Sequence, residues 1–188
     1  AQLEFESRVE LVRRGGRDAA LSALPHAVLQ QNLTLAISQR LSQIEAVRLG
    51  VFEIDPGELD RATQDFASSL APLQLPQFLA INEISMGEFE RLLRRDLQAD
   101  KYLTSRARLR APVGDAQVEA YLAAHPESGG AQATRAVRDA VRDDLTQARN
   151  TALVQTELRR LFAKSKVRIV DPGFAQADLP LRPASAGD

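Results

Sequence analysis

The stretch PHAVLQQNLTLAISQRLSQIEAVRLG, residues 25–50, carries the clearest structural signal in the chain. Apolar side chains recur in it every three or four residues, at Leu29, Leu33, Ile37, Leu41, Ile44 and Val47. Because an α-helix has about 3.6 residues per turn, this spacing aligns them on one stripe. Gly50 supplies a stop, since glycine readily takes the left-handed conformation that ends many helices. We therefore predict a long amphipathic helix over residues 25–50.

Helical patterns continue on both sides of this segment. Residues 2–14 place apolar side chains among charges and stop at Gly15 and Gly16. Further on, the sequence DPGE at residues 55–58 provides an N-cap acceptor, a proline at the first helical position and a glutamate at the third. These are the residue types that satisfy the free N–H groups at the start of a helix. A helix carrying Leu59, Ala62, Phe66 and Leu70 is expected to follow.

Three more helices are predicted downstream. Ser85 to Glu88 form a second capping box, which opens a helix to about Arg110. We expect that helix to hold Phe89, Leu92, Leu93 and Leu97 inside and Arg91, Arg94 and Arg95 mostly outside. A shorter helix covers residues 115–124, and a polar break at residues 125–130 separates it from the longest one, residues 133–164. The apolar side of the longest helix carries Val137, Val141, Leu145, Ala148, Ala152, Leu158, Leu161 and Phe162.

After the last helix, Lys166 to Val170 alternate in the manner of one short strand. The prolines that follow predict a loose tail over residues 171–188. The expected fold class is therefore mainly α: a helical bundle over residues 1–170, with a long C-terminal helix and one short C-terminal strand.

Composition excludes several classes of function. The 188 residues are 44% apolar and 26% charged, with a net charge of −1, so no broad field attracts nucleic acid. There is no cysteine, which removes disulfides and thiolate sites. No apolar run reaches the roughly 20 residues of a membrane span, so we expect contact with a membrane to be peripheral at most.

The common hydrolase, nucleotide-binding and zinc-protease motifs are absent from the sequence. The two histidines, His26 and His125, have no second ligand at metal-binding spacing and are expected to be exposed loop residues. Asp139, Asp143 and Asp144 alternate with arginines, so a solvated helix face is favoured over an acid/base or metal site. The basic stretch of residues 106–110 lacks the interleaved aromatics of a phosphate or nucleic-acid site. We expect no catalytic residues, no metal, no cofactor and no enzymatic activity.

The segment from Leu70 to Met86 is unusually apolar for a connection that holds two prolines. We predict a bend that leads into a short helical turn. Its apolar side chains either fold inward as core, which is the favoured alternative, or leave a patch open for a partner. In the second case they are the candidate client-binding residues: Leu73, Leu75, Phe78, Leu79, Ile81, Ile84 and Met86.

Several of these blocks together resemble a known family. The run from Leu24 to Pro126 holds the phrases IEAVRLG, EIDPGELDRAT, QFLAINEISMGEFERLLRRDLQADKYL and DAQVEAYLAAHP. In this order they resemble the N-terminal domain of SurA-like periplasmic chaperones, and residues 133–170 look like the long helix and strand that complete that domain. The resemblance covers roughly residues 1–170, and its motifs are packing and capping signals.

The resemblance implies a function without catalysis. In the family a parvulin prolyl-isomerase domain usually follows the helix that matches residues 115–124, whereas here only a short linker stands in that place. Two features depart from the family: the sequence starts just after the place where the usual VNGxxI strand is expected, and Gly114 replaces a serine cap. We therefore expect the edge of Val167 to Val170 either to be unpaired or to pair with another molecule, and the second alternative would give a homodimer.

The leading hypothesis is an ATP-independent periplasmic chaperone that binds unfolded or outer-membrane client polypeptides through an apolar groove. A signal peptide would then have been removed or would precede Ala1. The alternative is a non-catalytic adaptor that binds one specific folded partner in an envelope complex.

Overall fold

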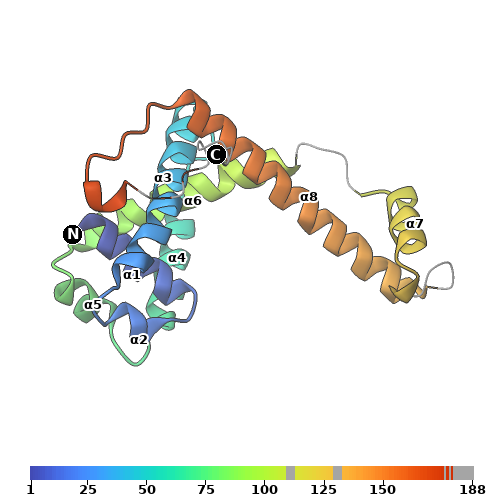
Figure 1. Cartoon of the computed structure of the whole chain (residues 1–188). Helices are drawn as coiled ribbons and strands as arrows, with labels where there is room; N and C mark the ends of the chain where they lie inside the picture. The colour runs from blue at the N-terminus through green and yellow to red at the C-terminus, as the bar shows by residue number, and fades with distance from the viewer. Residues whose placement is uncertain (109–112, 129–132, 176, 178, 180–188) are drawn as a thin grey trace. The chain divides into compact units, whose positions relative to one another are not determined.

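The computed structural model describes residues 1–108, 113–128, 133–175, 177 and 179. Within these residues the chain is mainly helical (Figure 1). It divides into two compact units, one of Ala1–Tyr102 with Leu158–Asp188 and one of Leu103–Glu157. The sequence analysis grouped residues 1–170 in one domain, whereas the structure distributes them over these two units.

Helices occur in all the predicted segments. The longer ones are α1 (Gln2–Arg13), α3 (His26–Arg48), α4 (Pro56–Ser69), α6 (Met86–Arg108), α7 (Asp115–Ala124) and α8 (Arg135–Lys164). The predicted turn in the connector is α5 (Leu75–Ile81), and a four-residue helix, α2 (Arg17–Ala20), was not predicted. The mainly α fold class is confirmed.

The caps predicted from sequence are present. Asp55 accepts a hydrogen bond from the backbone N–H of Glu58 at 3.0 Å, and Glu58 accepts one from the N–H of Asp55 at 3.2 Å. Ser85 and Glu88 repeat this exchange at 3.2 and 2.9 Å. Gly50 has the left-handed φ of 64° expected of a residue that ends a helix.

Aromatic rings from three helices and the connector form the centre of the first unit. Phe66 of α4 lies 5.0 Å from Phe89 of α6 and 5.7 Å from Phe78 of α5, measured between ring centroids. Phe5 of α1 adds a fourth ring, 6.1 Å from Phe78. Around these rings pack Val9, Val12, Leu59, Leu70, Leu75, Leu79 and Leu93. Burial of this cluster supplies the main driving force for folding of the unit.

Helix α3 shows a different face to the core from the one that its sequence suggests. Its buried residues are Ser38, Ser42, Glu45 and Ala46. On the predicted apolar stripe, Ile44 and Val47 are 53% and 57% exposed, and the other four members are only partly buried. Small residues let neighbouring backbone approach closely, so packing selects the serine face. The stripe exists, but it is not the buried side of the helix.

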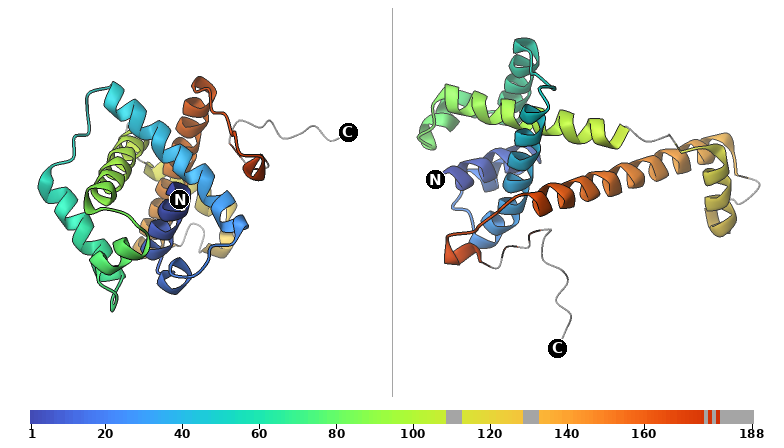
Figure 2. Two further views of the ribbon diagram at one scale, coloured as in Figure 1. Left: turned by 90° about the vertical axis from the view of Figure 1, so that its left-hand side faces the viewer. Right: turned by 90° about the horizontal axis from the view of Figure 1, so that it is seen from above.

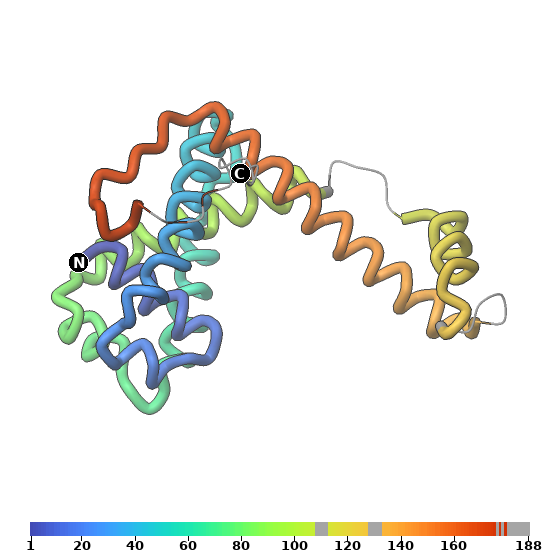
Figure 3. The backbone as a smooth tube through the Cα atoms, viewed as in Figure 1, coloured from blue at the N-terminus to red at the C-terminus, as the bar shows by residue number. Residues whose placement is uncertain are grey.

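The predicted C-terminal strand is not a strand in the structure. Residues 166–170 are extended, and Figure 3 shows them leaving the end of α8 without regular secondary structure. A strand needs a neighbour that supplies its backbone partners, and none of the described residues does so. The segment ends in a short 3₁₀ turn, Pro172–Phe174, which lies beside the start of α3 (Figure 2).

The turn at Pro172–Phe174 is fixed to α3 by a histidine. His26 Nε2 lies 2.8 Å from the carbonyl oxygen of Gly173, and its ring lies 4.7 Å from that of Phe174. The start of the predicted tail is thus in contact with the first unit, while residues 176, 178 and 180–188 lie outside the described part of the chain.

The second unit is built on the packing of α7 against the first half of α8. Val118 and Leu122 of α7 form a small core with Val113 and Val141. At its surface, Arg142 pairs with Asp115 at 2.7 Å, and Arg138 pairs with Glu119. This unit therefore has its own apolar cluster.

Candidate functional site

The seven candidate client-binding residues have different environments. Leu75, Phe78 and Leu79 are at most 7% exposed, belong to the core and do not line the hollow described below. Leu73 and Ile84 are partly buried against the same core. Ile81 and Met86 are exposed, at 63% and 41%. The favoured alternative of the sequence analysis, core, therefore holds for most of the connector, and the open patch is limited to its end.

A hollow lies in the first unit, between α1, α3 and α6. Its volume is about 700 Å³, and we call it the helical cavity. Ile84, at the end of the connector, is the one candidate residue that lines it. Met86 lies two residues from Ile84 and from Glu88, both of which line the cavity. Of the two exposed candidates, Met86 is thus close along the chain to residues of the cavity wall.

The wall of the cavity has an apolar part. Phe5 of α1 and Leu92 of α6 are 6% and 8% exposed, and Ile84 is half-buried beside them. Gln43 of α3 and Gln98 of α6 also line it and approach each other to 3.4 Å where the two helices cross. A hollow with apolar wall and polar amides at its side suits a polypeptide, which offers both kinds of group.

The charged part of the wall contains more basic than acidic residues. It contains four arginines, Arg40, Arg91, Arg94 and Arg95, and two glutamates, Glu6 and Glu88. Both glutamates are already engaged: Glu6 accepts a hydrogen bond from Arg95 at 2.8 Å, and Glu88 accepts two from Ser85. The bonds from Ser85 are the main cause of the lowered pKa of Glu88, so Glu88 stays charged.

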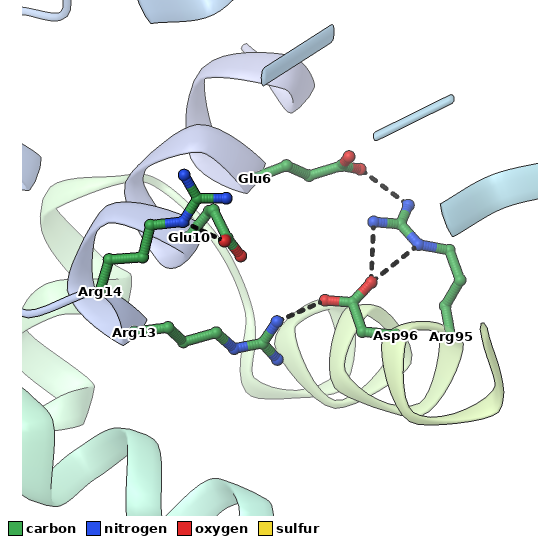
Figure 4. A network of polar contacts seen from close by, with 6 residues as sticks. All are labelled: Glu6, Glu10, Arg13, Arg14, Arg95 and Asp96. Atoms are coloured by element: carbon green, nitrogen blue, oxygen red, sulfur yellow. Dashed lines mark hydrogen bonds and ion pairs between the residues drawn. The ribbon is translucent and has the colours of Figure 1, made fainter. Parts of the chain in front are cut away.

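Arg95 belongs to a buried ion network between α1 and α6 (Figure 4). Its guanidinium donates to Asp96 Oδ1 at 3.3 Å as well as to Glu6. Arg13 of α1 reaches Asp96 Oδ2 at 2.9 Å from the other side. Figure 4 also shows the separate pair of Glu10 and Arg14 on α1, 2.6 Å apart. The network fixes α1 on α6 along one wall of the cavity.

Burial dominates the titration of Asp96. Desolvation raises the pKa of its carboxyl group above the usual range, and the nearby charges of Arg13 and Arg95 only partly oppose this. Arg95 has a raised pKa, because Glu6 and Asp96 together outweigh the cost of its own burial. The prediction that Arg95 lies mostly outside is wrong, since Arg95 is 8% exposed.

The remaining residues that the sequence singled out are the two histidines, three aspartates and a basic stretch. His125 stacks on Tyr121 with ring centroids 4.1 Å apart, and His26 contacts the 3₁₀ turn described above. Asp139 pairs with Arg142 at 2.7 Å on an exposed face, and Asp143 and Asp144 are exposed as well. Of the basic stretch 106–110, the last two residues lie outside the described part of the chain.

Two further features are absent from the described ranges. No cluster of three or more His, Cys, Asp or Glu residues there could hold a metal ion. No helix among those residues is both long and apolar enough to cross a membrane.

Comparison with known proteins adds no relative: no family model, curated protein or solved structure matches the chain. The site is therefore interpreted from its own chemistry.

Sequence reasoning missed the arginines of the cavity for a physical reason. Arg40 lies on α3, and Arg91 and Arg94 lie on α6, about 50 residues further along the chain. Each alone has the pattern of a solvated surface residue. Only the crossing of α3 and α6 brings them to one hollow, and nothing in the local sequence encodes that crossing.

Proposed function

We propose that this chain is an ATP-independent chaperone that binds extended or unfolded polypeptides in the helical cavity. Its client surface consists of the apolar wall at Phe5, Ile84 and Leu92 together with the exposed side chains Ile81 and Met86. The observation that carries the proposal is the cavity itself, about 700 Å³ in volume and lined in part by Ile84 of the connector. The motifs that resemble SurA-like chaperones support it independently.

The chemistry of the surface matches the demands of holding a client. Apolar contact discriminates poorly among sequences, so a small apolar wall can accept many different chains. Because the surface is small, affinity should be weak, with a Kd of about 1 µM, which corresponds to about −8 kcal/mol. Such binding is reversible and needs no nucleotide, metal or other cofactor. In this proposal the chain has no prolyl-isomerase activity, and its place of action is the periplasm.

The test is suppression of aggregation of a chemically unfolded client. The purified chain, in several-fold molar excess, should lower light scattering after the client is diluted from denaturant. The double variant Ile81→Asp with Met86→Asp should lose most of this effect, because two charges then replace the exposed apolar side chains of the proposed client surface. Val170→Asp is the matched control, since Val170 is 79% exposed and does not line the cavity.

Two results would overturn the proposal. The first is no suppression by the wild-type chain, and the second is equal suppression by the double variant after circular dichroism has shown it to be folded. Isolation of one stoichiometric folded partner, with no affinity for unfolded chains, would instead favour an adaptor in an envelope complex.

A further inference from the structure

Three guanidinium groups in the wall of the helical cavity have no counter-ion among the residues that the structure describes. Arg40, Arg91 and Arg94 all line it, and all three residues are exposed. None of them makes a hydrogen bond or ion pair with any residue that the structure describes. Arg91 contributes to the lowered pKa of Glu88, but it is the smallest of the causes. The cavity thus presents three positive charges that no acidic side chain in the described part of the chain neutralises directly.

The acidic groups of the same wall do not compensate for these charges. Glu6 is bonded to Arg95, which it neutralises, and Glu88 is held by the cap at Ser85. The hollow therefore holds a local excess of positive charge, although the whole chain carries a net charge of only −1. Guanidinium groups bind carboxylates through paired, directional hydrogen bonds, so an anion with flat oxygen geometry suits them.

The apolar part of the wall further restricts which ligands fit the cavity. Phe5, Leu92 and Ile84 lie in the same hollow as the three arginines. A small inorganic anion would leave this apolar surface wet, and a purely apolar segment would leave the arginines without partners. A ligand that carries both a carboxylate and an apolar side chain satisfies both parts of the wall.

We propose that the cavity selects client segments in which a carboxylate stands next to apolar side chains, with Arg40, Arg91 and Arg94 as the carboxylate-binding residues. This rests on the proposed function, to which it adds a preference among clients. The carboxylate comes either from an Asp or Glu side chain or from the C-terminus of the client. Both sources present the same group, and the experiment separates them.

The probes are three versions of one fluorescent 12-residue peptide that alternates Phe or Leu with Ser. The first has a central Glu and an amidated C-terminus, the second has Gln in place of Glu, and the third has Gln with a free C-terminal carboxylate. Binding is followed by fluorescence anisotropy at low salt and again in 1 M salt. We expect at least one carboxylate peptide to bind about tenfold more tightly than the amidated Gln peptide. Salt should reduce this difference, because it screens exposed charges.

Variants assign the effect to the cavity. The triple variant Arg40→Gln, Arg91→Gln, Arg94→Gln should bind the amidated Gln peptide as the wild type does and should lose the preference for carboxylate. Arg61→Gln is the matched control, because Arg61 is an exposed arginine on α4 that does not line the cavity. It should keep the preference. Binding of the amidated Gln peptide also shows that the triple variant is folded.

The outcomes separate this inference from the proposed function. If all three peptides bind the wild type equally, the chain holds clients but does not select carboxylates, and the inference alone fails. It fails also if the triple variant keeps the preference or if Arg61→Gln loses it. If no peptide binds and no client is kept from aggregating, the proposed function fails and the inference fails with it.

Discussion

At the scale of single residues, the contact between α1 and α6 depends on one buried carboxylate. The side chain of Asp96 is 5% exposed and lies between Arg13 and Arg95. Replacing a buried ion pair with apolar groups can be neutral, but removing one partner leaves a desolvated charge behind. In this network Arg95 is the charge at risk, because its side chain is 9% exposed and keeps only Glu6 when Asp96 is lost.

We predict that Asp96→Ala lowers the free energy of unfolding by about 3 kcal/mol, measured by urea denaturation. Glu10→Ala is the control, since it breaks the ion pair with Arg14, whose side chain is 64% exposed. Pairs of that kind contribute about 0.5 kcal/mol or less. Equal losses in the two variants would show that the network around Asp96 is not buried.

Glu45 gives the chain an acid-sensitive contact. It accepts hydrogen bonds from Arg48 at 2.8 Å and from Arg160 of α8 at 3.2 Å. The bond from Arg48 is the main cause that lowers the pKa of Glu45 from 4.5 to about 2, and the bond from Arg160 adds to it. Because the folded pKa lies below the unfolded one, the stabilisation is fully present above pH 4.5 and is lost as the pH falls toward 2.

We predict that Glu45→Gln lowers the free energy of unfolding at pH 7 by about 1 kcal/mol, the value of a partly exposed ion pair. The difference between variant and wild type should shrink steadily between pH 4.5 and 2, as followed by thermal unfolding in a pH series. A difference that stays constant over that range would mean that Glu45 does not titrate as part of these contacts.

At the scale of elements, α3 provides the sharpest test of the packing. Neighbouring positions on this helix have opposite environments: Ala46 is fully buried, and Val47 is 57% exposed. We predict that Val47→Lys changes the free energy of unfolding by no more than about 0.5 kcal/mol. Ala46→Leu should lower it by about 1 to 3 kcal/mol, because a larger side chain has no room there. A larger loss for Val47→Lys than for Ala46→Leu would show that the apolar stripe faces the core.

How much of a helix can be predicted from sequence depends on whether the contacts that determine it are local, as α3 illustrates. Helix starts such as Asp55 and Ser85 could be predicted, because a cap is a contact between residues three apart. The existence of the apolar stripe on α3 could also be predicted from its period. Which side of α3 faces the core could not, because that depends on the partners that α1, α6 and α8 present to it.

The candidate site was less predictable than the helices. The apolar composition of the connector was visible in the sequence, and so was the alternative that most of it is core. The cavity was not visible, because its wall combines Phe5, Arg40 and Ile84 from three separate segments. A strand at residues 166–170 was predicted from alternation alone, and alternation cannot say whether a pairing neighbour exists.

At the scale of the whole molecule, the two units have separate apolar cores. The first unit is centred on the rings of Phe66, Phe78 and Phe89. The second depends on a much smaller cluster around Val118, Leu122 and Val141. Stability against local opening follows the amount of buried apolar surface, so the second unit should open more readily than the first. Helix α8 contributes to both, since Arg135–Lys164 crosses the boundary at residue 158.

Hydrogen exchange of the full chain tests this independence. We predict that Val118→Ala, which removes two methyl groups from the small core, lowers the free energy of opening of the second unit by about 2 kcal/mol. Amides of α7 and of residues 135–145 should then exchange about 30-fold faster. Amides near Val9, Phe66 and Leu93 should keep their wild-type rates, because their protection comes from the first unit. Faster exchange in both units by the same factor would show that they open together, and the division of the chain into two cooperative parts would be wrong.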